Sequence, residues 1–150
     1  MKSIFARKDI EELIDRINCL SPASPGLWGK MTVSQMLAHC NVAYEMTFGD
    51  KHPAPNPFVK LMLRLFVKNK VVSDQPHKPN GRTAPAFLVS SEKDFEIEKN
   101  RLIRYIQQTQ QLGAEHFHMK ESPSFGKLTQ TEWNKMLYKH LDHHLKQFGV

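Results

Sequence analysis

The apolar residues of this chain recur with a helical period along most of its length, and this limits its possible folds more than any other feature. In the first example, Ile10, Leu13, Ile14 and Ile17 are spaced i, i+3, i+4 and i+7. This spacing predicts a helix over residues 8–19 with one face buried against other elements. The sequence "SPASPG" follows, and its prolines and glycine end the helix.

Two further helices begin with a capping box, in which a threonine at the N-cap is followed three residues later by Glu or Gln. Thr32 and Gln35 form the first of these pairs, and Thr129 and Glu132 form the second. The helix that begins after Thr32 is expected to bury Val33, Met36, Leu37, Cys40 and Tyr44. The helix that begins after Thr129 is the last of the chain.

Periodicity alone predicts two more helices, over residues 57–72 and about 91–112. The apolar side of the first is expected to face the core and to comprise Phe58, Leu61, Met62, Leu65 and Phe66. Its solvated side is expected to carry Lys60, Arg64 and Lys68. The second is expected to end at Gly113 and to bury Phe95, Leu102, Ile106 and Leu112. A short extended piece is expected at "HFHM", residues 116–119.

The connection "SDQPHKPNGRTAPAF" has no periodicity and contains three prolines. A stretch of this length without regular structure is either a lid or binding loop, or a crossover between distant helix ends. Four substantial helices and no series of strands predict an all-α protein. We expect a four-helix bundle with a long proline-containing crossover loop and one short extra helix. The expected bundle is a single domain over residues 1–150, a length sufficient for one core.

The composition is typical of soluble globular proteins, because 40% of the residues are hydrophobic and 24% are charged. No stretch approaches the roughly 18 apolar residues that span a bilayer. The N-terminal stretch turns acidic before the apolar core of a secretion signal can develop. Cys19 and Cys40 have no CxxC spacing and are interpreted as buried small hydrophobic residues. A reducing, cytoplasmic location is therefore expected.

A basic region covers residues 51–82, where seven Lys or Arg residues accompany one acid, Asp74. Such a region could hold phosphates, but no base-reading motif or aromatic platform accompanies it, so nucleic-acid binding is disfavoured. The helix at 57–72 also has the pattern of a helix that lies on a membrane surface. A helix that flanks a core has the same pattern and is commoner, so no membrane partner is expected.

Two histidines, His140 and His144, lie in the middle of the apolar stripe of the last helix. This stripe also carries Trp133, Leu137 and Phe148. Residues spaced i, i+4 lie one above the other on a helix, so the two imidazoles converge on a point where they can hold one metal ion. His39 lies at the edge of the apolar face of the helix that follows Thr32, and it is the natural third ligand.

Three imidazoles suit Zn, Ni, Fe or Cu, and a set of three leaves a coordination position open for water or substrate. The competing interpretation is three core histidines bonded to neighbouring side chains, and the spacing leaves both possibilities open. His143 falls on the flank of the stripe. Asp142 falls on the opposite side of the helix, so it cannot act as the glutamate of an HExxH protease motif.

The other four histidines are interpreted as surface residues. His116 and His118 would share one side of an extended segment, but neither lies on a core helix. His52 and His77 adjoin prolines in predicted loops.

The segments "WGKMTVSQMLAHC" around His39 and "WNKMLYKHLDHHLKQFG" near the end of the chain resemble the DinB/YfiT-like superfamily of four-helix bundles. The resemblance is closest to a branch of unknown function, and it extends over nearly the whole chain. The metal histidines of the superfamily are one in the second helix and an HxxxH pair in the last. They correspond to His39, His140 and His144, so the resemblance implies a divalent metal, Zn or Ni, at these residues.

Characterised members of the superfamily are thiol-dependent enzymes, such as bacillithiol or mycothiol S-transferases and a maleylpyruvate isomerase. In them the metal lowers the pKa of a thiol cofactor. The resemblance thus implies a metal-dependent enzyme, a thiol S-transferase or a hydrolase, with a small-molecule substrate and a low-molecular-weight thiol as a second cofactor. No residue of this sequence identifies a pocket for the thiol. The alternative is a non-catalytic bundle that binds a metal, a small ligand or a partner protein. An exposed apolar face on a small bundle would favour a homodimer.

Overall fold

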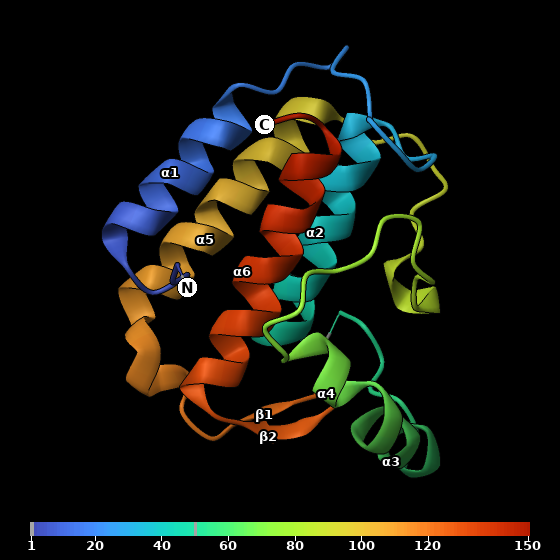
Figure 1. Cartoon of the computed structure of the whole chain (residues 1–150), viewed down its shortest axis with the longest axis vertical. Helices are drawn as coiled ribbons and strands as arrows, with labels where there is room; N and C mark the ends of the chain where they lie inside the picture. Colours follow the sequence, from blue (N-terminus) through green and yellow to red (C-terminus); the bar gives the residue numbers. More distant parts are fainter. Residues whose placement is uncertain (1, 50) are drawn as a thin grey trace.

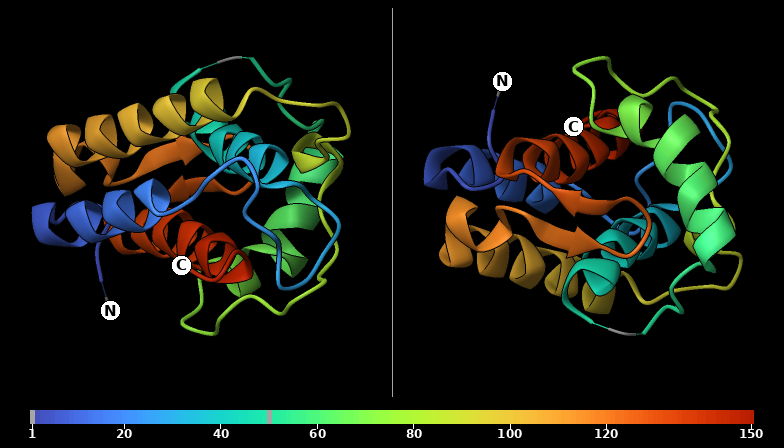
Figure 2. Two further views of the ribbon diagram at one scale, coloured as in Figure 1. Left: turned by 90° about the horizontal axis from the view of Figure 1, so that it is seen from above. Right: turned by 90° about the horizontal axis from the view of Figure 1, so that it is seen from below.

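Four long helices form the body of the protein in the computed structural model, which describes residues 2–49 and 51–150. They are α1 (Arg7–Asn18), α2 (Val33–Phe48), α5 (Phe95–Phe117) and α6 (Gln130–Gln147). The four helices lie side by side, and α5 and α6 each contact both α1 and α2 (Figure 1, Figure 2). The predicted helical bundle is therefore confirmed in its main outline.

The remaining elements lie outside the four-helix body. They are α3 (Pro57–Phe66), α4 (Lys68–Val71), the short 3₁₀ helix η1 (Pro85–Phe87), β1 (Lys120–Ser122) and β2 (Gly126–Leu128). The two strands pair antiparallel and form a hairpin across one end of the bundle, between α5 and α6 (Figure 1). Sequence reasoning missed this hairpin, because its strands are only three residues long and show no alternation. It follows directly after the predicted extended piece at 116–119, which instead spans the end of α5 and a turn.

The periodic residues of the predicted helices occupy the core. On α1 the buried residues are Ile10, Leu13 and Ile17. All five apolar residues expected to be buried on α2 are buried. Trp133 and Leu137 of α6 are also buried, and Trp133 packs its ring against Phe117. The 3.6-residue period thus correctly assigned the inner faces of these three helices.

Both predicted capping boxes are present. Thr129 accepts a hydrogen bond from the backbone N–H of Glu132 at 3.2 Å, and the Glu132 carboxylate accepts one from the backbone N–H of Thr129 at 2.9 Å. Thr32 and Gln35 make the equivalent pair of bonds at the start of α2. Each box satisfies backbone donors that the first turn of a helix leaves without a partner. These two caps set the start of the helices that carry the three candidate ligands.

Replacing Thr129 with alanine should lower the free energy of unfolding by about 0.5–2 kcal/mol, because the first turn of α6 loses its N-cap bond. The exposed Thr131 of the same turn is the matched control, and Thr131→Ala should change the stability by less than about 0.5 kcal/mol. Denaturant titration of both variants measures the difference. Equal stabilities would mean that the cap does not stabilise the helix.

The helix predicted over residues 57–72 is divided into two helices, and its apolar side faces solvent instead of the core. A break at Val67 separates α3 from α4. Leu63 rests against the core, whereas Phe58, Leu61 and Leu65, which were expected to face the core, are exposed. The basic side is not simply solvated either. Its Lys60 and Lys68 form ion pairs of 2.8 Å with Glu121 of β1 and Glu132 of α6, respectively.

The helix expected over residues 91–112 begins later and continues further. Asp94 caps it, so α5 begins at Phe95. Gly113 has φ 74° and ψ 167°, which breaks the regular helix as predicted, but one more helical turn follows. This turn carries Phe117 into the core. Leu112, predicted to face inward, is exposed beside the break.

Buried polar side chains join α2 to α5. Glu45 of α2 pairs with Arg101 of α5, and Arg101 also pairs with Glu98 at 3.0 Å. Asn41 donates to the Glu98 carboxylate at 2.7 Å. A buried charge is costly unless it is paired, so these contacts fix one register between the two helices.

Two residue-level expectations outside the site are decided by the structure. Cys40 is buried as expected, but Cys19 is exposed because it lies just beyond the last turn of α1. Among the described residues, no helix has the length and apolar character needed to cross a membrane.

Candidate metal centre

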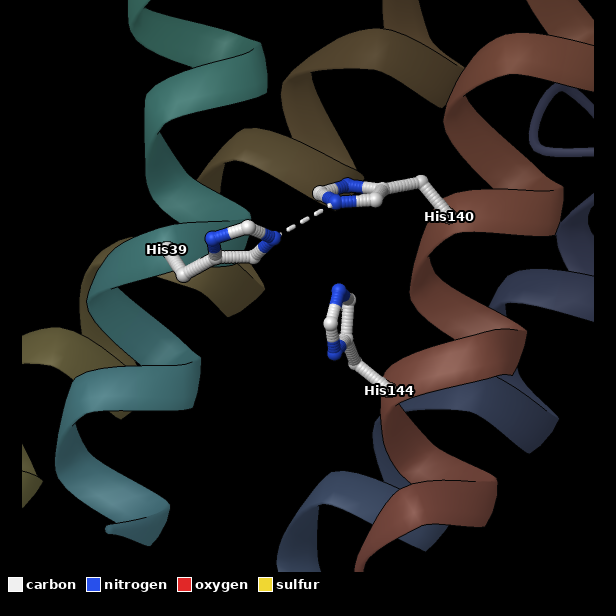
Figure 3. Close-up of side chains that lie close together, drawn as sticks. All are labelled: His39, His140 and His144. Carbon is white, nitrogen blue, oxygen red and sulfur yellow. Dashed lines mark hydrogen bonds between the residues drawn. The ribbon is translucent and has the colours of Figure 1, made fainter. Parts of the chain in front are cut away.

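Three histidines from two helices converge inside the bundle, as predicted. His39 comes from α2, and His140 and His144 come from successive turns of α6 (Figure 3). One ring nitrogen from each can be chosen so that all three lie within 4.8 Å of one another. His39 and His144 are buried, and His140 is partly buried. Among the residues that the structure describes, this is the one group of three or more His, Cys, Asp or Glu side chains close enough to hold a metal ion.

The rings lie close to the separation that a shared metal requires. The Nε2 atoms of His39 and His140 are 3.0 Å apart. Two imidazoles on one tetrahedral zinc, each at about 2.0–2.1 Å, would hold their nitrogens about 3.3 Å apart. A shift of a few tenths of an ångström therefore converts this hydrogen bond into a pair of ligands. The full set of ligand atoms lies within 4.8 Å, so other pairs must close by up to about 1.5 Å, and the three residues fit a divalent cation after movement of their side chains.

The crossover loop orients the His39 ring. The Nδ1 atom of His39 lies 2.9 Å from the backbone carbonyl oxygen of Phe87. A carbonyl can only accept, so Nδ1 carries the proton and Nε2 of the neutral ring keeps its lone pair toward the other histidines. Such hydrogen bonds from the second ring nitrogen fix the tautomer of metal-binding histidines in proteins.

A second chain of bonds orients His144. The Gln147 side chain donates from Nε2 to the carbonyl oxygen of Trp28 at 2.8 Å, which leaves its Oε1 facing Nδ1 of His144, also at 2.8 Å. His144 must therefore carry its proton on Nδ1, and its Nε2 is the free ligand atom. Gly29 permits this contact. It has φ +81°, and a Cβ at this position would lie 2.5 Å from the Gln147 amide nitrogen.

Burial keeps the three imidazoles neutral. It lowers the pKa of His39, and it lowers the pKa of His144 to about 3. The pKa of His140 lies well below its usual value, first because of burial and second because of the neighbouring His144 and His39. Neutral imidazole is the form that coordinates a metal, so protons compete weakly for this site at neutral pH.

The crossover loop packs against the rings of His39 and His140. The ring of Phe87 is centred 5.4 Å from that of His39 and 5.8 Å from that of His140. His77 approaches from the same loop, with its ring 6.5 Å from His140 and 5.6 Å from His143. Burial lowers the pKa of His77 to about 4. His77, which was interpreted as a surface residue, is half-buried. Of the two roles considered for the loop, the position of Phe87 and His77 favours a cover over the site.

The remaining histidines and Asp142 lie outside the cluster, as predicted for most of them. His116 and His118 are exposed, whereas His52 is half-buried and contacts the Glu45 carboxylate at 2.5 Å.

His143 lies on the flank of α6, where its ring contacts the rings of Trp28 and His144. Asp142 pairs with Arg16 of α1 at 2.9 Å, away from the three rings. The exclusion of an HExxH arrangement is thus consistent with the structure.

Sequence reasoning missed the residues that orient the ligands. Gln147 follows His144 by three residues and is buried, so a polar residue on the apolar stripe was a usable signal. The carbonyl groups of Phe87 and Trp28 carried no signal, because backbone acceptors on loops can be placed only once the fold is known.

A family model described as "Protein of unknown function (DUF1569)" matches residues 5–149. The chain belongs to this family. The match includes both helices of the metal centre and the loop that covers it, so the whole site lies within the family's domain. No curated protein and no solved structure matches the chain. The function of this DUF1569 chain must therefore be argued from the site.

Replacing Gln147 with alanine should weaken zinc binding by about tenfold to a hundredfold, because His144 loses the acceptor that fixes its tautomer and ring. Gln107 is exposed on α5, and Gln107→Ala is the matched control with unchanged affinity. Competition with a chromophoric chelator measures both constants. Wild-type affinity in Gln147→Ala would show that the contact is merely structural.

Proposed function

We propose that this protein is a metal-dependent enzyme of the DinB/YfiT type, in which His39, His140 and His144 hold one divalent ion, Zn or Ni. The observation that carries the proposal is the convergence of three neutral imidazoles. Two of them donate from Nδ1 to Phe87 and Gln147, which leaves the lone pair on Nε2 free to bind a metal. Three protein ligands, rather than four, are typical of catalytic sites, which keep one position for water or substrate.

The ligand set favours activation of a nucleophile. The cluster contains only imidazoles, so no carboxylate offsets the charge of the cation. When bound, the ion would lower the pKa of a coordinated thiol or water and so supply a thiolate or hydroxide at neutral pH. A thiol S-transferase and a hydrolase both use this chemistry. The expected substrate is a small molecule, with a low-molecular-weight thiol as the second cofactor for the transferase.

The chain's own residues position the site and exclude water. His39 and His144 present their Nε2 lone pairs without a change of tautomer, because their Nδ1 protons are already donated in hydrogen bonds. His140 donates from Nε2 to His39 in the present arrangement, so its proton must lie on Nδ1 when it serves as a ligand. The apolar ring of Phe87 packs beside His39 and His140, and exclusion of water strengthens the electrostatic effect of a cation.

The second candidate is a non-catalytic metal-binding bundle, and the same cover favours it. The rings of Phe87 and His77 both lie against the partly buried His140. A catalytic site requires this loop to open or to leave a channel, whereas a storage or structural site does not. The two functions therefore differ in whether an added ligand reaches the metal.

Cobalt substitution tests this difference. Co²⁺ bound at the three histidines gives an absorption spectrum that reports coordination number and ligand type. We expect added 2-mercaptoethanol or cysteine to produce a sulfur-to-cobalt charge-transfer band in the wild-type protein, and Phe87→Ala to accelerate its appearance. The His143→Ala variant should behave like wild type. A cobalt spectrum that neither thiol nor azide changes would exclude an open position and favour the non-catalytic bundle.

A further inference from the structure

Helix α3 presents large apolar side chains to solvent. Phe58 and Phe66 are 71% and 70% exposed, and Leu61 and Leu65 are 50% and 58% exposed. They share a ten-residue helix with Leu63, which rests on the core. Single exposed leucines are ordinary, but four large apolar residues gathered on one short helix mark a surface that binds something.

The position of α3 leaves this apolar face accessible. The helix packs mainly against the short α4 and projects beside the hairpin, outside the four-helix body (Figure 1, Figure 2). The metal centre lies between α2 and α6, so the α3 face takes no part in it. Phe58, Leu61, Leu65 and Phe66 are termed the α3 apolar face below.

The segment that carries the α3 apolar face is rich in cations. Residues 51–73 contain five Lys or Arg residues and no Asp or Glu. Arg64 on α3 and Lys70 on α4 are exposed. Three of the five cations are paired within the chain, Lys51 with Glu45, Lys60 with Glu121 and Lys68 with Glu132. An occupant that supplies an apolar phase and negative charge for Arg64 and Lys70 therefore fits this surface best.

A second copy of the chain does not meet this requirement. A two-fold interface joins the same patch on both subunits, so it would bring Arg64 and Lys70 of one subunit close to the same residues of the other. The net charge of +6 on each chain adds to this repulsion. An anionic bilayer meets both requirements. Its acyl boundary accepts Phe and Leu side chains, and its headgroups pair with flanking Lys and Arg.

We propose that α3 is a membrane-surface helix that docks the protein reversibly on anionic lipid through the α3 apolar face, with Arg64 and Lys70 as electrostatic contacts. The expectation of no membrane partner assumed that this face packs against the core, and the structure shows that it does not. A ten-residue helix that inserts four apolar side chains binds a membrane weakly. Binding therefore needs both the apolar side chains and the attraction of Arg64 and Lys70 to anionic headgroups.

Vesicle co-sedimentation of the full chain tests the proposal. Vesicles of phosphatidylcholine alone are compared with vesicles of equal parts phosphatidylcholine and phosphatidylserine. We expect wild type to bind only the anionic vesicles and to dissociate at high salt. The double variant Leu61→Gln with Leu65→Gln should lower the partition coefficient at least about tenfold. Arg64→Gln with Lys70→Gln should lower it by about tenfold or more.

The control is Ile97→Gln on α5, because Ile97 is 59% exposed and matches Leu65. It should leave binding unchanged, and circular dichroism should show all variants equally folded. Two results would overturn the proposal. One is wild type that stays in solution with both kinds of vesicle. The other is wild type that forms a dimer which the Leu61→Gln, Leu65→Gln variant converts to monomer, since the face would then bind a second copy.

Discussion

Replacing any one of His39, His140 and His144 with alanine should weaken zinc binding by more than about a hundredfold. Two imidazoles from one helix hold a metal weakly, and the third must come from the facing helix, so the loss of His39 should match that of either α6 histidine. Calorimetric titration of the wild type and the three variants measures the affinities. The metal-free proteins should all remain folded, because the bundle has its own apolar core.

His143→Ala is the matched control, because His143 belongs to the same helix and touches His144 but lies outside the cluster. Its affinity should stay within about tenfold of wild type. Zinc should also raise the melting temperature of wild type and of His143→Ala by mass action, but not that of the ligand variants. Equal affinities in all five proteins would rule out the three-histidine site.

Acidification from pH 7 to pH 4 should lower the free energy of unfolding of the metal-free protein by about 3 kcal/mol through His144 alone. The pKa of His144 is about 3 in the folded state, against about 6.5 in the unfolded chain. The unfolded state therefore binds more protons below pH 6.5. This stability is fully present above the unfolded pKa and is lost as the pH falls toward 3. His39 and His140 act in the same direction, because burial lowers their pKa values too.

Denaturant titrations at a series of pH values give the number of protons taken up on unfolding. His144→Gln should remove about one proton from this number between pH 6 and pH 4. If His144→Gln had the same pH dependence as wild type, His144 would not be a buried neutral imidazole.

The inner faces of α1, α2 and α6 could be predicted because each helix buries one continuous stripe. The two threonine caps were predictable because a capping box depends only on two residues that are three positions apart. Helix α3 shows the limit of this reasoning. The apolar residues of α3 do share one side of the helix, but their spacing cannot show whether that side faces the core or solvent. Leu63, which actually rests on the core, lies off that stripe.

The candidate ligands were predictable because two of them share one helix at spacing four, and His39 lies at the edge of the apolar face of the capped helix α2. The orientation of their rings depends on contacts that no local pattern encodes. Phe87 and His39 are 48 positions apart, and Gln147 and Trp28 are 119 positions apart. The cover formed by His77 and Phe87 belongs to a loop without periodicity, so only the three-dimensional structure could place it over the site.

The most direct test of the metal centre is an anomalous difference map at the zinc absorption edge, from crystals of zinc-loaded protein without a histidine tag. We expect one strong peak about 2.0–2.1 Å from Nε2 of each of His39, His140 and His144. The Nδ1 bonds to Phe87 and Gln147 should be retained. A map without a peak between these rings, or with zinc bound only at exposed residues such as His116 and His118, would contradict the assignment.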